Sequence, residues 1–426
     1  MGQDSPIETL ETKAQTSNES TIIYIVLLGF LLSYILFFII PVFLNPEHRM
    51  LSESGVPIWH EIGSDIKRIH WYFEAWRFRG VSPNAEGCIY APLAFLAYAP
   101  LQWVDFGTAY FILTTLTILS YVFATFLIPL RILKAHGNES LPLLVLFSVT
   151  GAFSYGFQFE LERGQFNVIA FFLSLLAVYF YYYSKKYWYL SYLLITLAIQ
   201  LKIWPLIFLI FLAGNWRNWS YCLARLCAIL VFNFGCLFIL GTDVFYGFMH
   251  TLSQKIGSDF FILTTNHSIA SFSGLFPKYG TRFLPMIPSC WLVPLSWFFK
   301  VFFVLSAVTC FCAIWWASLK RPKEGMDPTL LLGCVLMACL IPSESIDYKL
   351  PVLAAPVLLF FTSLQTSVHL TLKWFRYGIV FVMAFAYSAT LYPGAYKPLY
   401  LTNNCPLLMI ILAGAAICAV LDMKRL

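Results

Sequence analysis

The stretch GTAYFILTTLTILSYVFATFLIPLR, residues 107–131, carries no charged side chain before its last residue, Arg131. A helix of this length crosses the hydrocarbon core of a bilayer, which is about 30 Å thick. The rest of the chain has the same character, because 60% of its 426 residues are hydrophobic and only 11% are charged. Soluble domains are about half apolar and about a quarter charged. The sequence therefore predicts an all-α, polytopic membrane protein.

Apolar runs of similar length recur along the chain and predict about twelve membrane-spanning helices, within a range of about 10 to 13. The runs lie at 21–44, 107–131, 142–158, 166–184, 187–201, 203–215, 224–245, 289–319, 328–342, 350–365, 376–392 and 404–422. Lys and Arg in the short loops fall on one side of this arrangement, as is typical of cytoplasmic loops. Both termini are therefore predicted to be cytoplasmic, and the large loops 45–106 and 246–288 extracytoplasmic.

Residues 21–422 are predicted to form a single integral membrane domain. Residues 1–20 are polar and acidic and lack the basic start of a signal peptide, so we expect a disordered cytoplasmic leader. Residues 423–426 are expected to form a short cytoplasmic tail. A composition rich in Phe and Ile without a targeting signal favours a bacterial inner membrane.

Charge and cysteine usage argue against several classes of protein. The net charge is +6, but Lys and Arg are spread between the apolar runs, so no nucleic-acid partner is expected. The eleven cysteines are scattered without a Cys-x-x-Cys pair, and paired carboxylates typical of a metal cluster are missing. We therefore expect no metal site and no cofactor.

The first large loop contains GSDIKRIHWYFEAWRFRG, residues 63–80, which holds six charged residues in a chain that otherwise avoids charge. Apolar residues at helical spacing form one stripe within it: Ile66, Ile69, Phe73 and Trp76. This pattern predicts a helix lying in the membrane interface on the extracytoplasmic side. Tyr-Ala-Pro-Leu then occurs at 90–93 and again at 98–101, and the two prolines favour a short surface helix over a crossing.

Asp65 stands near the start of that predicted helix and is open to two interpretations. If Ser64 caps the helix, the carboxylate of Asp65 lies in the first turn, where the helix dipole stabilises it. Alternatively, Asp65 is a general base at the membrane boundary that takes the proton from an acceptor hydroxyl. The sequence leaves both roles open.

The segment ELERGQFN, residues 160–167, ends one apolar run and opens the next. The planar fork of donors on Arg163 suits a phosphate. Gln165 and Asn167 offer amide donors to phosphate oxygens or sugar hydroxyls. The alternative is a plain polar turn in which Asn167 caps a helix.

Other polar residues are predicted on the same extracytoplasmic face. Lys202 lies between two apolar runs, where a lysine must snorkel, pair or face a cavity, and we expect it to bind an anion. The segments 264–269 and 342–350 add Asn266, His267, Asp347, Tyr348 and Lys349. Cations, acids and amides on one face suit a donor with a lipid tail and an anionic phosphate, whose leaving charge the cations would stabilise.

The order of these motifs resembles the polytopic GT-C glycosyltransferases of family 87, which are related to polyprenyl-phosphate-mannose-dependent mannosyltransferases. The resemblance covers about residues 20–420 and rests on SD…RFRGVSP…YAPL, RGQFN, LKIWPL, NHSI and Ser-x-Asp-Tyr-Lys-Leu. Two motifs depart from the family: Tyr90-Ala91-Pro92-Leu93 stands for aromatic-Pro-Pro-Leu, and Asn266-His267-Ser268 for Asn-Gln-Ser.

The resemblance implies a GT-C fold and an inverting hexosyltransferase or related glycosyltransferase. The enzyme would take mannose, or another hexose or pentose, from a polyprenyl-phosphate donor and pass it to a lipid-glycan or cell-envelope acceptor on the extracytoplasmic face. The catalytic acid of the family maps onto Asp65.

Two other functions stay open at this point. A transporter or flippase would use Lys202 as a substrate ligand within the membrane, although the two halves of the chain show no hydropathy symmetry. An O-antigen-type ligase or polymerase would share the multi-span plan, but its very large late loop is not evident.

Overall fold

The structure is a computed structural model of the chain. It describes residues 62–80, 90–135, 141–213, 218–257, 266–283, 285–320, 325–363 and 403–423, with isolated residues between 21 and 35 and between 377 and 382. The predicted leader 1–20 and nearly all of the predicted tail 423–426 lie outside the described residues, so both stay predictions.

The described part of the chain is helical, and its one β contact is an isolated bridge between Asn266 and Ile346. Its helices are α3 (Ser64–Arg79), α4 (Pro92–Tyr98), η4 (Ala99–Trp103), α5 (Phe106–Val122), η5 (Phe123–Leu127), α6 (Ile128–Ala135), α7 (Leu141–Ala152), α8 (Tyr155–Arg163), α9 (Asn167–Tyr183), α10 (Leu190–Leu201), η6 (Trp204–Phe208), α11 (Leu209–Leu212), α12 (Trp219–Cys236), α13 (Thr242–Gly257), α14 (Ile269–Phe283), α15 (Ser289–Lys320), α16 (Pro328–Leu340), η7 (Asp347–Leu353), α17 (Ala354–Ser363) and α19 (Cys405–Met423). The predicted all-α class is confirmed for these residues.

Four helices in the described residues are long and apolar enough to cross a membrane: Phe106–Ala135, Trp219–Cys236, Ser289–Lys320 and Cys405–Met423. A fifth is obtained if the bent pair formed by α7 and α8 counts as one span. The count of about twelve therefore stays a prediction. Several runs with the hydropathy of spans are shorter helices of 10–17 residues, and the described part of the run 203–215, which ends at Ala213, contains η6 and α11.

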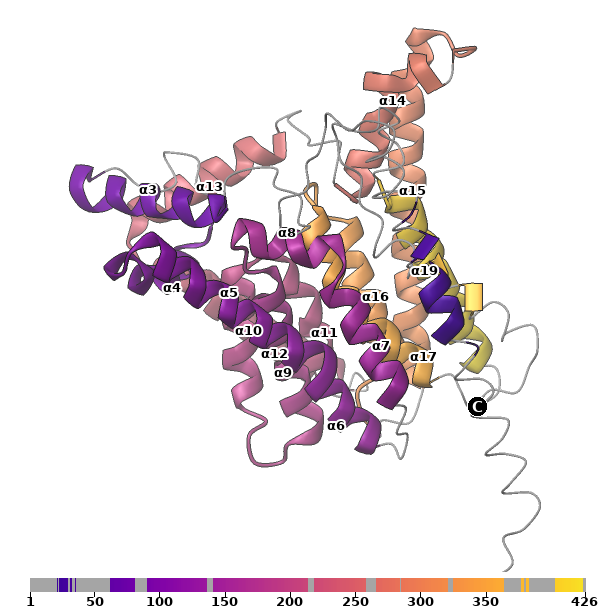
Figure 1. Ribbon diagram of the computed structural model, residues 1–426, viewed down its shortest axis with the longest axis horizontal. Helices are drawn as coiled ribbons and strands as arrows, with labels where there is room; N and C mark the ends of the chain where they lie inside the picture. The colour runs from indigo at the N-terminus through magenta and orange to yellow at the C-terminus, as the bar shows by residue number, and fades with distance from the viewer. Residues whose placement is uncertain are drawn as a thin grey trace, which may run out of the picture.

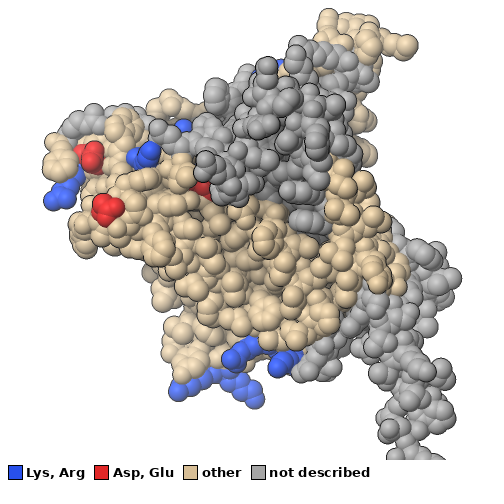
Figure 2. Space-filling model, in the orientation of Figure 1, with Lys and Arg blue, Asp and Glu red and all other residues tan. Residues whose placement is uncertain are grey.

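The two ends of the helix bundle differ in their charged residues. In Figure 1, α3, α4, α8, α13 and α14 lie toward the upper end, and α6 reaches the lower end. Figure 2 shows Lys and Arg along the lower edge of the visible face, whereas acids and bases occur together at the upper left. Arg131 and Lys134 in α6 are exposed. The predicted orientation depends on this asymmetry of basic residues.

The core is centred on α16, in which every residue from Thr329 to Leu340 is buried. A helix that is apolar all round belongs at the centre of a bundle. Asp327 caps its first turn, because the carboxylate accepts the backbone N–H groups of Thr329 and Leu330 at 2.8 and 3.2 Å. Pro328 follows at the first helical position, where no N–H is needed.

A buried amide pair attaches α12 to α10. Gln200 donates from its side chain to the backbone and side-chain oxygens of Asn233, at 3.0 and 3.2 Å. Asn233 in turn donates to the hydroxyl of Thr196 at 3.3 Å. Apolar contact alone drives helix association weakly in lipid, so hydrogen bonds of this kind hold neighbouring helices together.

The amphipathic helix predicted in residues 63–80 is present as α3. Ile66 and Ile69 are fully buried, whereas Phe73 and Trp76 are half-buried and pack on Phe95. The predicted apolar stripe is therefore confirmed as the packed face, while its depth in a membrane interface stays a prediction. The short helix expected around the repeated Tyr-Ala-Pro-Leu is present as α4, extended by the 3₁₀ turn η4.

Candidate functional site

Two glycines bring the start of α3 against the end of α8. Gly63 takes a left-handed conformation (φ 68°), and its N–H donates to the carbonyl of Glu162 at 2.7 Å. Gly164 ends α8, also left-handed at φ 68°, and a Cβ there would stand 2.7 Å from Cδ1 of Ile66. Only glycine lets the two backbones meet in this way. The next side chains along both segments consequently face one another.

Asp65 lies in the first turn of α3, as expected, but Ser64 does not cap the helix. Gly63 occupies the N-cap position and makes no side-chain hydrogen bond. A glycine is used there because the chain must turn tightly beneath Glu162. The dipole role of Asp65 is thus compatible with the structure, while the capping role assigned to its neighbour is wrong.

Asp65 forms a two-pronged ion pair with Arg163. The guanidinium donates from Nη2 to Oδ1 at 2.9 Å and from Nε to Oδ2 at 3.1 Å. The side chains are 7% and 14% exposed, respectively. Arg163 also lies over the ring of Phe159, with 5.7 Å between its Cζ and the ring centroid. The planar fork of arginine matches a carboxylate in this geometry, and burial makes the pair expensive to break.

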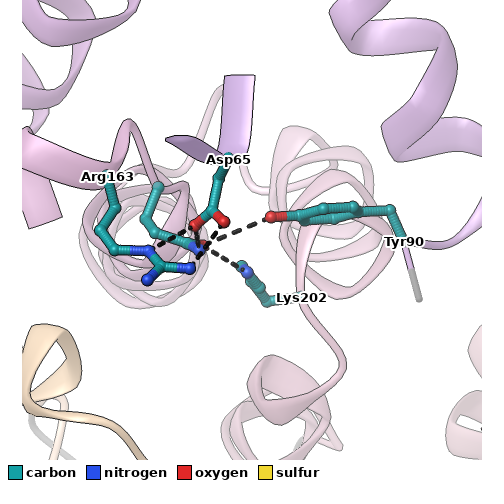
Figure 3. Close-up of polar contacts among 5 residues, drawn as sticks. Asp65, Tyr90, Arg163 and Lys202 are labelled. Atoms are coloured by element: carbon teal, nitrogen blue, oxygen red, sulfur yellow. Dashed lines mark hydrogen bonds and ion pairs between the residues drawn. The ribbon is translucent and has the colours of Figure 1, made fainter. Parts of the chain in front are cut away.

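Gln165 joins this pair to Lys202. Its amide nitrogen donates to Oδ2 of Asp65, and its amide oxygen accepts from Nζ of Lys202 at 2.8 Å. The hydroxyl of Tyr90 reaches the same oxygen at 3.5 Å, and Nζ of Lys202 lies 4.8 Å from the centroid of the Tyr90 ring. Figure 3 shows Arg163, Lys202 and Tyr90 converging beside Asp65. We call these five residues the Asp65 group.

Lys202 enters the group because the chain breaks there. Helix α10 ends at Leu201, Lys202 is extended (φ −149°, ψ 139°), and the 3₁₀ turn η6 carries Pro205 near its start. Pro205 has no backbone N–H to donate to the preceding helix, so α10 cannot continue through it and the chain at Lys202 can leave helical geometry. The break predicted at Lys202 is therefore confirmed, and the half-buried ammonium of the lysine meets a polar partner in Gln165.

Asn167 lies next to the Asp65 group but has other partners. It is the first residue of α9 rather than its cap. Its amide nitrogen donates to Glu160 at 3.2 Å, and its oxygen accepts from the indole of Trp204 at 3.3 Å. Glu160, fully buried, also accepts the backbone N–H of Val168 at 3.0 Å. The carboxylate of Glu160 thus satisfies the start of α9.

Tyr348 and Lys349 flank the group from η7. The ring of Tyr348 stacks on that of Phe159, with 5.8 Å between centroids, which places it beside the aromatic ring under Arg163. Nζ of Lys349 donates to the carbonyl of Glu344 at 2.8 Å and so closes its own loop. Asp347 begins η7, and its side chain lies outside the described residues.

Asn266 and His267 belong to a separate buried polar cluster. Asn266 donates to the carbonyl of Ser343 at 2.9 Å and accepts the backbone N–H groups of Ser268 and Ser345 at 3.1 and 2.9 Å. Nδ1 of His267 accepts the backbone N–H of Asn404 at 3.0 Å. These bonds fix the loop that leads into η7. A donor-binding role for either residue stays a prediction.

The sequence patterns do not single out two residues of the site, Tyr90 in the repeated tetrapeptide and Glu160 in the segment 160–167. A carboxylate in so apolar a chain was itself a signal for Glu160. Among the described residues, no set of three or more His, Cys, Asp and Glu side chains is grouped to hold a metal ion, and the expectation of no metal stays a prediction.

Comparison with known protein families decides the class. The sequence model of glycosyltransferase family 87 matches residues 89–343, which is 255 of the 426 residues. The chain belongs to glycosyltransferase family 87. Its match includes Tyr90, Arg163, Gln165 and Lys202, whereas Asp65 precedes it. A search of curated proteins gave no match.

Membership of family 87 confirms the resemblance drawn from the motifs. Together with the four apolar helices long enough to cross a bilayer, it makes the protein a membrane glycosyltransferase. Such an enzyme requires a sugar donor and an acceptor. The Asp65 group joins one carboxylate and two cations in a single hydrogen-bonded set.

Proposed function

We propose that this family 87 enzyme transfers a sugar from a polyprenyl-phosphate donor to a lipid-glycan or cell-envelope acceptor, with inversion at the anomeric carbon. The observation that carries the proposal is the Asp65 group, in which one cation pairs directly with the acid and a second is linked to it through one amide. Asp65 is the general base in this reaction, and Arg163 and Lys202 bind the donor phosphate.

The reaction is a single displacement in which each group has one task. The acceptor hydroxyl oxygen attacks the anomeric carbon, while its proton passes to the carboxylate of Asp65. The bond from that carbon to the phosphate oxygen breaks, and its electron pair stays on the lipid phosphate. Two cations beside this oxygen stabilise the charge that develops there. Attack from the side opposite the leaving group inverts the configuration.

An apolar surface next to the site supports a donor with a lipid tail. The hydroxyl of Tyr110 in α5 donates to the carbonyl of Leu161 at 2.9 Å, which joins α5 to the helix carrying Arg163. One residue further along α5, Phe111 is 70% exposed, and Leu116 follows at 50%. A polyprenyl chain lying along α5 would place its phosphate at the level of the Asp65 group.

The proposed setting is a bacterial inner membrane, with both termini in the cytoplasm and the site on the extracytoplasmic face. Its support is the distribution of basic residues, since exposed Arg131 and Lys134 lie at the end of the Phe106–Ala135 helix remote from Asp105. A polyprenyl-phosphate sugar suits that face because nucleotide sugars are confined to the cytoplasm. Mannose is the first sugar to test, in view of the related mannosyltransferases.

Transfer by the purified enzyme in proteoliposomes tests the proposal, using a panel of polyprenyl-phosphate hexoses and pentoses. Asp65→Asn should lower the transfer rate by about 10²- to 10⁴-fold, the usual contribution of a general base. Glu74→Gln is the matched control, because Glu74 is an exposed acid on the same helix. Wild-type turnover by Asp65→Asn removes Asp65 from the mechanism.

The same vesicles separate the two other functions. A flippase would move labelled lipid across the bilayer without forming a glycosidic bond, and a ligase or polymerase would require a diphosphate-linked oligosaccharide. The family match does not favour either one.

A further inference from the structure

The ion pair of Asp65 raises a difficulty for the proposed mechanism. Both carboxylate oxygens accept hydrogen bonds from Arg163, and Oδ2 accepts a further one from Gln165. Both oxygens are therefore already occupied by donors, and the guanidinium covers the edge of the carboxylate that an acceptor hydroxyl would approach. Arg163 has to leave Asp65 before the proton of the acceptor can be taken.

The donor phosphate is the natural competitor for Arg163. Arginine binds phosphate and carboxylate with the same planar fork. Lys202 supplies a second cation to the phosphate, and Gln165 connects this lysine to Asp65. A phosphate that enters beside Lys202 therefore arrives next to the guanidinium of Arg163. Movement of Arg163 to the phosphate would free Oδ1 of Asp65 completely.

Gln165 is built to stay with Asp65 during this exchange. Lys202 and the hydroxyl of Tyr90 both donate to the amide oxygen of Gln165. The carboxylate of Asp65 can only accept, so it requires the amide nitrogen. The amide therefore has a single favourable orientation, with its nitrogen toward Asp65. The side chain is buried, and the backbone N–H of Gln165 donates to the carbonyl of Glu160 at 3.2 Å.

We propose that Gln165 is a positioning residue, which holds Asp65 by Oδ2 after the donor phosphate has taken Arg163 from the carboxylate. This inference rests on the proposed function and deepens it. It replaces the expectation that Gln165 binds the donor directly. One consequence is an order of binding, because Asp65 becomes a competent base only once the donor is present.

The test compares Gln165→Met with Gln158→Met. Methionine has about the volume of glutamine but lacks the amide. Gln158 is a half-buried glutamine of α8 that donates to the carbonyl of Ala152, outside the Asp65 group. For Gln165→Met we expect kcat to fall about 10- to 100-fold with donor KM within about threefold of wild type.

Gln158→Met should leave kcat and donor KM as in wild type. A large rise in donor KM for Gln165→Met would overturn the proposal, since it would make Gln165 a donor ligand. An unchanged kcat would overturn it as well.

A second arm needs no knowledge of the sugar. Binding of undecaprenyl phosphate is measured by native mass spectrometry in wild type, Gln165→Met and Asp65→Asn. We expect equal affinity in Gln165→Met, and affinity at least as high as wild type in Asp65→Asn, because the ion pair no longer competes for Arg163. Weaker binding by either variant contradicts the exchange. A wild-type protein that neither binds this lipid nor transfers a sugar from its glycosylated form contradicts the proposed function itself, and the inference falls with it.

Discussion

The Asp65–Arg163 ion pair makes a quantitative prediction about stability. Arg163→Gln leaves the carboxylate of Asp65 buried with Gln165 as its remaining partner in the Asp65 group. Breaking a buried pair from one side costs about 3–5 kcal/mol. Because the Arg163 side chain keeps 14% of its exposure, the lower end applies, and we expect a loss of about 3 kcal/mol in the free energy of unfolding.

The reciprocal change should cost less. Asp65→Asn keeps one oxygen that can accept from Arg163 and leaves no buried negative charge, so we expect a loss of about 1–2 kcal/mol. Since both changes destroy the same contact, the double variant should lose about 3 kcal/mol, which corresponds to a coupling energy of about 1–2 kcal/mol.

The assay is equilibrium unfolding of the purified protein by steric trapping in bicelles, which gives free energies for all four proteins of the cycle. Glu74→Gln serves as the control, because an exposed acid should change stability by no more than about 0.5 kcal/mol. If the loss measured for the double variant equals the sum of the two single losses within about 0.5 kcal/mol, the two residues do not interact. That result would refute the buried contact on which the site depends.

Three further predictions concern the elements that hold the site. Asn233→Leu removes the two side-chain hydrogen bonds between α12 and α10, while the bond from Gln200 to the backbone carbonyl at position 233 remains. The change should cost about 0.6–2 kcal/mol, with faster hydrogen exchange in α12 as the readout. Gly164→Ala forces a left-handed alanine against Ile66 and should cost about 1–3 kcal/mol, measured by unfolding, and reduce transfer. Thr108 lowers the pKa of Asp105 through hydrogen bonds that cap α5. The carboxylate of Asp105 therefore stabilises the folded state fully above its unfolded pKa of about 3.9, and this stabilisation is lost as pH falls further. In Asp105→Asn, the melting temperature should consequently fall less steeply than in wild type as the pH is lowered through this range.

The sequence predicted those features that depend on local pattern. Ile66 and Ile69 recur at helical spacing, and both are buried on one face of α3. Lys202 beside Pro205 predicted a break, and α10 ends there. Asp65, Arg163, Gln165 and Lys202 were chosen as chemically unusual for so apolar a chain, and the structure brings all four into contact.

The features that could not be predicted depend on tertiary contacts. Residues 65 and 163 are 98 positions apart, so nothing local shows that they pair. Asn167 and Asn266 have the same amide as Gln165, but Glu160 and the backbone near Ser343 take their hydrogen bonds. Hydropathy also does not give the length of a helix: the apolar run 328–342 forms the 13-residue α16, which is shorter than the roughly 20 residues that usually cross a bilayer, so its crossing stays a prediction.

The identity of lipid bound to the protein tests the central claim most directly. The wild-type enzyme, extracted mildly and analysed by mass spectrometry, should carry a polyprenyl phosphate or its glycosylated form. The amount should fall sharply in Lys202→Met, which removes one of the two proposed phosphate-binding cations, and remain in Gln158→Met. Wild-type protein that carries ordinary phospholipid but no polyprenyl phosphate, even after incubation with undecaprenyl phosphate, would contradict the claim.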